Sequence, residues 1–280
     1  MSEPFGALSP SPAQEGFRAL GRCLPANWAG RKAASLLLGP AGGRARRAFD
    51  VTVFGTQKAR LHPYDNICEK RVYLTPQLWD PEERRLLGDV ISKFGGRTFR
   101  FVDVGANAGL YTLFARAETL RAGAALKAAC VEADPEMATR LQFNVAASGA
   151  QDDVEIFECA ASEREGTLAF AVNPDSRGLS RVDPAGALMV RARPLMAIVE
   201  DAKFERIDAM KLDIEGHETP VVQGFLKAAA KALRPTLVIL ETSHAGDGPG
   251  AAAAFFGAGY ALRLKTRRNA VLVRADQTPG

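Results

Sequence analysis

FVDVGANAGLYTLFAR, residues 101–116, decides the fold of this chain. An apolar run typical of a strand ends in small residues, and apolar residues then recur with helical spacing at Leu110, Leu113 and Phe114. Glycine is favoured where the backbone turns sharply or a ligand approaches closely, and free amides at a helix start attract anionic groups. The stretch therefore predicts a strand, a ligand-binding loop and a helix.

From residue 99 onward, short apolar runs alternate with helical segments, which is typical of βαβ units around a parallel sheet. The predicted strands are 99–104, 128–132, 154–158, 208–212, 236–240, 260–265 and 269–274. Too few residues separate the last two strands for a helix. We therefore predict an α/β fold: a Rossmann-like, doubly wound, mostly parallel seven-stranded sheet with a C-terminal antiparallel hairpin.

Two helix starts carry the same signal, an aspartate followed by proline at Asp80–Pro81 and Asp134–Pro135. Aspartate is a preferred N-cap residue and proline is favoured in the first turn. Both aspartates are predicted N-caps. The segment 166–194 interrupts the alternation of strands and helices. One explanation is an inserted hairpin over the site, in which Arg177 and Ser180 contact an acceptor. The other is an edge of the sheet with a plain surface loop.

Composition limits the class of protein. The 280 residues are 47% hydrophobic, enough for one large core. The four cysteines form no C-x-x-C pair, which argues against a zinc or iron–sulfur site and favours a reducing cytoplasm. No apolar run approaches the ~18 residues of a transmembrane helix, and the N-terminus lacks the features of a signal peptide.

The net charge of +4 is unevenly distributed. Residues 1–60 contain nine basic and three acidic residues, a net charge of +6, so the remainder carries −2. We predict a basic, partly disordered extension at 1–55 and a single domain at 56–280. The extension is either a solvated tail or a patch for an anionic partner, and the acidic remainder gives no footprint for nucleic acid.

The loop of residues 103–109 reads D-x-G-x-x-x-G, not the G-x-G-x-x-G of dinucleotide sites, so an NAD-dependent oxidoreductase is disfavoured. Glu132, at the end of the next predicted strand, is suited to accept both hydroxyls of a ribose. Together they predict a nucleoside ligand with a short charged arm. The alternative is an ordinary strand–helix turn in which Glu132 only caps backbone.

Four segments, FVDVGANAGLYTLFA, VEADPE, VEIFECAASEREGTLAF and IDAMKLDIEGHETPVVQGF, occur in the order found in the FkbM family. The chain resembles these S-adenosylmethionine-dependent methyltransferases, which mostly methylate hydroxyl oxygens, over residues 60–275. The resemblance implies S-adenosylmethionine as cofactor and a cofactor site made of Asp103, Gly105, Ala106, Asn107, Gly109, Glu132, Ala133, Cys159 and Ala160. Asn107 replaces the middle glycine of the usual methyltransferase loop, as it does in the family.

KLDIEGHE, residues 211–218, places several acids after the strand predicted at 208–212. We predict Asp213, with Glu215 close by, at the cofactor or acceptor, and His244 as a general base because imidazole titrates near neutral pH. The alternatives are helix capping by Glu215 and Glu218, an exposed loop histidine, or a divalent-ion site, which residues so close in sequence rarely form. No metal is predicted.

The acceptor pocket is the least defined part of the sequence. His62 and Tyr64 are candidates for its lining. The hypothesis is O-methylation of a small-molecule or saccharide hydroxyl, with no nucleic-acid partner and an open oligomeric state. A non-catalytic cofactor-binding module that acts through its basic extension is the competing class.

Overall fold

The computed structural model describes residues 3–174, 176–243 and 250–277, and a seven-stranded sheet lies at its centre. The strand order is β12–β13–β11–β10–β3–β4–β5. The bounds are β3 (Thr98–Val104), β4 (Ala125–Glu132), β5 (Val154–Glu158), β10 (Ala209–Leu212), β11 (Leu237–Glu241), β12 (Tyr260–Lys265) and β13 (Asn269–Arg274). Neighbours from β11 to β5 are parallel, and β13 runs antiparallel to β11 and β12. The predicted α/β fold with a mostly parallel sheet is confirmed.

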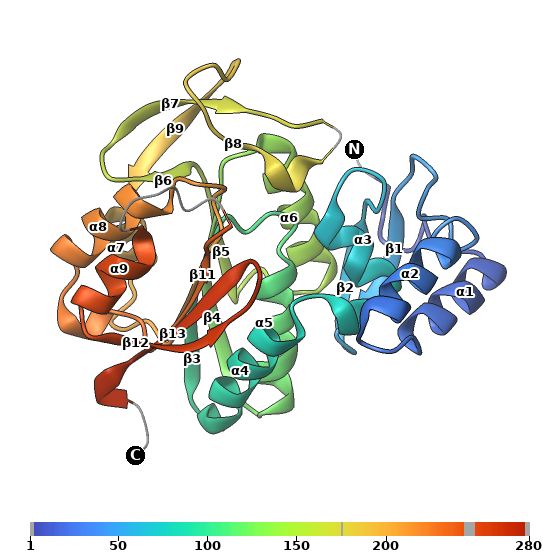
Figure 1. Cartoon of the computed structure of the whole chain (residues 1–280), viewed down its shortest axis with the longest axis horizontal. Coiled ribbons are helices and arrows are strands. Elements are labelled where there is room, and N and C mark those ends of the chain that lie inside the picture. Colours follow the sequence, from blue (N-terminus) through green and yellow to red (C-terminus); the bar gives the residue numbers. More distant parts are fainter. Residues whose placement is uncertain (1–2, 175, 244–249, 278–280) are drawn as a thin grey trace.

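Helices cover both faces of this sheet (Figure 1). One face carries α4 (Pro81–Ile91), α5 (Leu110–Arg121) and α6 (Pro135–Ala147), and the other carries α7 (Leu195–Asp201), α8 (Glu218–Ala228) and α9 (Ala251–Gly257). Along β3, Phe99 and Phe101 join the core under the first layer, while Val102 and Val104 join the core under the second. Burial on both faces explains why the strands read as continuous apolar runs.

The strand order reverses between β3 and β10. From β3 the chain moves to β4 and β5 on one side, and β10 and β11 lie on the other. In such sheets a ligand binds beyond the carboxyl ends of the strands at this point of reversal. Asp103, Glu132 and Asp213 lie at or just after the carboxyl ends of β3, β4 and β10, which is where the sequence predicted the chemistry.

The N-terminal segment differs from the prediction. From residue 3 it is folded rather than partly disordered, with α1 (Pro12–Arg22), α2 (Trp28–Leu37), β1 (Phe49–Val53), β2 (Gln57–Leu61) and α3 (Ile67–Leu74). Ser11 and Gln14 form a capping box at α1, and Arg18 Nε donates to the Tyr73 carbonyl at 3.1 Å. Phe49 is fully buried in the core. The predicted domain boundary at residue 55 falls in the turn between β1 and β2. The structure has no boundary there, because both strands contribute residues to one core.

Both predicted N-cap positions are correct, but only one of the two carboxylates caps its helix. The Asp134 carboxylate accepts the Glu136 amide at 2.9 Å and caps α6. Asp80 precedes α4 but makes no capping bond, and its backbone is left-handed, with φ 39°. Its Oδ2 instead accepts the Tyr111 hydroxyl at 3.1 Å. The Asp-Pro pattern marks the start of α4, but the Asp80 carboxylate hydrogen-bonds to α5 instead of capping α4.

The interrupting segment forms a second sheet, of β6 (Ala160–Ser162), β7 (Gly166–Ala171), β8 (Arg181–Val182) and β9 (Leu188–Pro194), in the order β6–β9–β7–β8. It lies above the central sheet in Figure 1. Short 3₁₀ turns occur at Pro76–Leu78, Ser92–Phe94, Arg177–Leu179, Lys231–Leu233 and Ala275–Gln277. In the described ranges, no helix combines the length and apolar character needed to cross a membrane.

Asp50 ties the N-terminal segment together. Its carboxylate accepts Arg60 Nε at 2.7 Å, Arg60 Nη2 at 2.9 Å and the amides of Gly6 and Leu8. Burial raises the pKa of Asp50, but the hydrogen bonds from Arg60 and the two amides outweigh it, so the pKa lies below its ordinary value.

We expect Asp50→Asn to lower the free energy of unfolding at pH 7 by about 3 kcal/mol, because Arg60 then loses its buried counter-ion. A carboxylate with a lowered folded pKa stabilises above its unfolded pKa of about 4 and loses this contribution as the pH falls through the folded pKa. Urea unfolding at pH 7 and pH 3 should therefore show a deficit that shrinks in acid. The exposed Asp152→Asn is the control, and a deficit that is equal at both pH values would contradict the account.

Candidate active site

The loop after β3 is held against the end of β10. Gly105 has φ 76°, and a Cβ on it would lie 1.9 Å from the Asp213 carbonyl oxygen. The Asp213 amide donates to the Val104 carbonyl at 3.0 Å. The amides of Gly105 and Ala106 both donate to the Val131 carbonyl of β4, at 2.9 and 3.0 Å. Three strand ends therefore meet at one glycine, which only a residue without a side chain permits.

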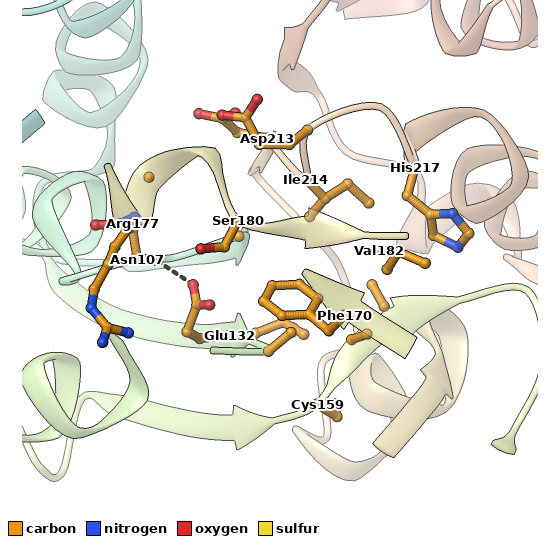
Figure 2. Close-up of a pocket in the computed structure, with 17 residues that line it drawn as sticks. Asn107, Glu132, Cys159, Phe170, Arg177, Ser180, Val182, Asp213, Ile214 and His217 are labelled. Atoms are coloured by element: carbon orange, nitrogen blue, oxygen red, sulfur yellow. Dashed lines mark hydrogen bonds between the residues drawn. The ribbon is translucent and has the colours of Figure 1, made fainter. Parts of the chain in front are cut away.

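Glu132 fixes the other half of the loop (Figure 2). Its Oε2 accepts the Asn107 amide at 2.6 Å and its Oε1 accepts the Asp134 amide at 2.8 Å. Asn107 has φ 54°, and its Oδ1 accepts Asn66 Nδ2 at 2.7 Å. The carboxylate thus both supports the loop and lines the cavity below it.

That cavity is the first pocket. Six residues predicted for the cofactor line it: Gly105, Asn107, Glu132, Ala133, Cys159 and Ala160. Phe170 and Val182 of the second sheet close its far wall, and Arg177 and Ser180 lie beside Asn107 and Glu132 (Figure 2). The pocket is therefore acidic at one end and apolar at the other, as a ribose joined to a flat base requires.

A second pocket adjoins the first. The two share the lining residues Gly105, Asn107, Gly178, Asp213 and Glu215. The second pocket is rich in charge, with Asp80, Asp103, Lys211, Glu241, Arg71, Arg267 and Arg268 in its lining. Two ligands in the two pockets would meet at the strand reversal.

An ion pair between a buried lysine and a partly exposed aspartate lies at this junction. Lys211 Nζ contacts Asp213 Oδ2 at 2.8 Å. Burial opposes the charge of Lys211, but the carboxylates of Asp213 and Asp103 raise its pKa. Asp103 is completely buried, and burial raises its pKa to about 6 against the effects of Lys211 and the Thr112 hydroxyl. Asp103 Oδ2 accepts from Thr112 at 2.8 Å, while Oδ1 has no hydrogen-bond partner in the described part of the chain.

Two further carboxyl groups titrate near neutral pH. Burial raises the pKa of Glu132 to about 7, although hydrogen bonds from three backbone amides oppose the shift. Burial, with the nearby charge of Asp213, raises the pKa of Glu241 to about 7. Glu241 Oε1 accepts the Ser243 amide at 2.9 Å, whereas Oε2 is buried and makes no hydrogen bond to any described residue. Glu241 is among the residues that line the second pocket.

The remaining predicted residues are placed as follows. Ala106 lines the second pocket. Gly109 lines neither of the two pockets; its φ is 81° and it packs against Leu141 at the start of α5. Glu218 accepts the amides of Ile214 and Gly216, which lie in the loop before α8. His244 lies outside the described residues. Within those residues, no group of three His, Cys, Asp or Glu side chains is arranged to hold a metal.

Sequence reasoning missed several lining residues. Lys211 could have been found, because residues two apart on a strand share a face, and Lys211 and Asp213 are so spaced. No sequence pattern predicted Phe170 and Val182 as lining residues, because they lie in the inserted second sheet. His62 and Tyr64 line neither pocket; the His62 amide bonds Glu69 at 2.6 Å, and α3 instead contributes Ile67, Cys68 and Arg71 to the second pocket.

Comparison with known proteins identifies the family. The family model described as the methyltransferase FkbM domain matches residues 103–261. The chain therefore belongs to the FkbM methyltransferase family, as its motifs predicted. A search of the curated proteins gives no match.

Solved structures similar to the chain include the methyltransferase FkbM from Methylobacillus flagellatus KT, with TM-score 0.45, 18% identity and coverage of 74% of this chain and 54% of that one. The chain thus spans about half of that protein. An O-methyltransferase from Bacillus cereus in complex with SAH gives TM-score 0.41 and 13% identity, covering 93% and 97%. TrmK of M. capricolum, in complex with S-adenosylhomocysteine, gives 0.37 and 10%, covering 67% and 66%.

We expect Lys211→Met to lower the free energy of unfolding by about 3 kcal/mol at pH 8, because it leaves the buried Asp103 and the partly exposed Asp213 without their cation. The loss raises the folded pKa of Asp103 further. An acid with a raised folded pKa destabilises above that pKa and ceases to do so once protonated. The deficit should therefore shrink toward pH 5 in urea unfolding. The exposed Lys127→Met, which loses only a bond to the Asp152 carbonyl, should show no such trend; a deficit that grows in acid would contradict the assignment.

Proposed function

We propose that this chain is an S-adenosylmethionine-dependent methyltransferase that O-methylates a hydroxyl of a small molecule or saccharide. The observation that carries the proposal is the junction of two pockets at Gly105 and Asp213, with Glu132 in the first pocket and Glu241 in the second. The first pocket has a lining suited to a nucleoside. The second has the carboxylate of Glu241, one oxygen of which makes no hydrogen bond to a described residue. Membership of the FkbM family supports the choice of donor.

The residues present fit this cofactor. Glu132 faces the first pocket and is suited to accept ribose hydroxyls, and Cys159, Ala160 and Phe170 form an apolar wall for adenine. The unpartnered Asp103 Oδ1 is a buried acceptor for an ammonium group. When bound, S-adenosylmethionine supplies an electrophilic methyl group on a sulfonium. The acidic junction, where Asp213 and Glu215 belong to both pockets, favours a cationic centre there.

On the acceptor side the chain must orient a hydroxyl and remove its proton. Holding two reactants in line contributes up to roughly 7–11 kcal/mol. Glu241 is the best base of the described residues, because its pKa of about 7 matches neutral conditions and its Oε2 has no other partner. Asp213, already paired with Lys211, is better suited to position the acceptor. Glu215 and His244 remain candidates for the same step. The free cysteines are in keeping with the proposed cytoplasmic location.

A turnover assay tests the proposal. The protein is incubated with S-adenosylmethionine and a panel of hydroxylated small molecules and saccharides, and release of S-adenosylhomocysteine is measured. Because the base must be ionised, kcat should rise with pH through about 7. Glu241→Gln should lose ~10²–10⁴-fold in kcat and lose this pH dependence. The exposed Glu205→Gln is the control.

If Glu241→Gln keeps the rise through pH 7, another group is the base. Binding of the cofactor without turnover of any acceptor in the panel would favour the non-catalytic module.

Cofactor affinity should also depend on pH. Burial holds the pKa of Glu132 at about 7, and only the ionised carboxylate accepts from both ribose hydroxyls. We therefore expect the affinity for S-adenosylhomocysteine to rise by about tenfold between pH 6 and pH 8. Calorimetric titration of Glu132→Gln should show weaker binding without this rise. The same pH dependence in the variant would remove Glu132 from the site.

A further inference from the structure

The segment of residues 16–49 contains seven basic residues and no acidic one. They are Arg18, Arg22, Arg31, Lys32, Arg44, Arg46 and Arg47. The proposed methyltransferase site uses none of them. Arg18 is buried and Arg22 pairs with Glu15, so five basic side chains, on α2 and the turn after it, are exposed without a carboxylate partner in the described residues. Such a surface attracts anions.

The same surface exposes large apolar side chains. Trp28 is 71% and Leu36 is 76% exposed, the two largest values among the exposed large hydrophobic residues, and Leu20 on neighbouring α1 is 56% exposed. Trp28, Lys32 and Leu36 are four residues apart along α2 and so share one face of the helix. Lys32 Nζ lies 5.2 Å from the centroid of the Trp28 ring. Apolar and basic groups therefore alternate along one exposed stripe.

Hydrogen bonds and close packing hold this face in place. The Asn27 side chain caps α2, and a Cβ on Gly30 would lie 1.9 Å from the Pro25 carbonyl oxygen, so the turn before the helix is tight. Arg44 Nη2 donates to the Ser35 carbonyl at 3.0 Å and holds the basic turn against the helix. Gln77 Nε2 donates to the carbonyls of Gly21 and Leu24 and joins the segment to the rest of the fold. In Figure 1, α1 and α2 form the outermost layer on the side away from α7–α9.

We propose that this face, defined by Trp28, Leu36 and the five exposed basic residues Arg31, Lys32, Arg44, Arg46 and Arg47, docks the protein on an anionic lipid surface. Tryptophan and leucine among lysine and arginine on one helix face suit the boundary between headgroups and acyl chains. A second copy of this chain is a poor occupant, because two such faces would repel. Nucleic acid would bind the basic groups, but it would make no contact that explains the exposed Leu36. It is therefore a poorer occupant than a lipid surface.

Vesicle co-sedimentation of the full chain tests the proposal. The protein should bind mixed phosphatidylcholine–phosphatidylglycerol vesicles, and not phosphatidylcholine alone, with an affinity that falls as salt rises. Trp28 emission should shift to the blue on binding, while Trp79, which is already buried, should not respond. The shift should be absent in Trp28→Phe.

Two pairs of variants separate the apolar and basic contributions. Trp28→Ala with Leu36→Ala, and Arg31→Glu with Lys32→Glu, should each weaken binding by at least about tenfold. The matched controls are Phe256→Ala, an exposed apolar residue on α9, and Lys227→Glu with Arg263→Glu, exposed basic residues outside the face. Neither control should change binding.

Failure to bind anionic vesicles, or equal binding to neutral ones, would overturn the proposal. So would self-association without lipid that Leu36→Ala abolishes, or binding of duplex DNA or RNA in place of vesicles. All variants lie on the surface, and circular dichroism should show them folded. Because the face lies apart from the cleft, loss of vesicle binding with methyl transfer retained would still support docking.

Discussion

A single close approach, between the Cα of Gly105 and the carbonyl oxygen of Asp213, sets the geometry of the whole cleft. It exists because β3 and β10 are parallel neighbours whose chains leave the sheet in opposite directions. The loop after β3 must pass against the backbone after β10, and only glycine leaves room. Residues 211–218 thereby come beside residues 103–109, although about a hundred residues separate them. Both pockets begin at this point.

The electrostatics of the cleft follow from the same crowding. The carboxyl ends of β3, β10 and β11 bring Asp103, Asp213 and Glu241 to the second pocket. Lys211 is the buried cation beside Asp103 and Asp213. Burial disfavours ionised carboxyl groups, and this raises the pKa values of Asp103 and Glu241 toward neutrality. Carboxyl groups with pKa values raised toward neutrality are typical of sites that bind a cation or transfer a proton.

Local patterns sufficed to predict the parts of the molecule that depend on local physics. The loop at 103–109, Glu132 at the end of β4 and the Asp134 cap all follow from short-range spacing and backbone chemistry. Asp80 carries the same local signal as Asp134, yet its carboxylate bonds Tyr111, a residue thirty-one positions away. No residue near Asp80 in the sequence predicts that its carboxylate bonds Tyr111.

The other differences also have long-range causes. Residues rich in glycine, proline and alanine suggested a loose extension, but Arg18, Phe49 and Asp50 fix it through contacts with Tyr73 and Arg60. Phe170 and Val182 reach the first pocket only because an inserted sheet folds over the strand ends. Pattern reasoning finds which residues begin a helix or end a strand. It does not find which distant surfaces pack together.

The central claim is that the first pocket is a nucleoside site for a sulfur cofactor rather than for a dinucleotide. The direct measurement is calorimetric titration of the protein with S-adenosylmethionine, S-adenosylhomocysteine and NAD, repeated on Asp103→Ala. The account predicts saturable binding of both sulfur nucleosides, weakened in the variant, and none of NAD. Binding of NAD alone, or of no nucleoside, would contradict it and require a different ligand for the loop at 103–109.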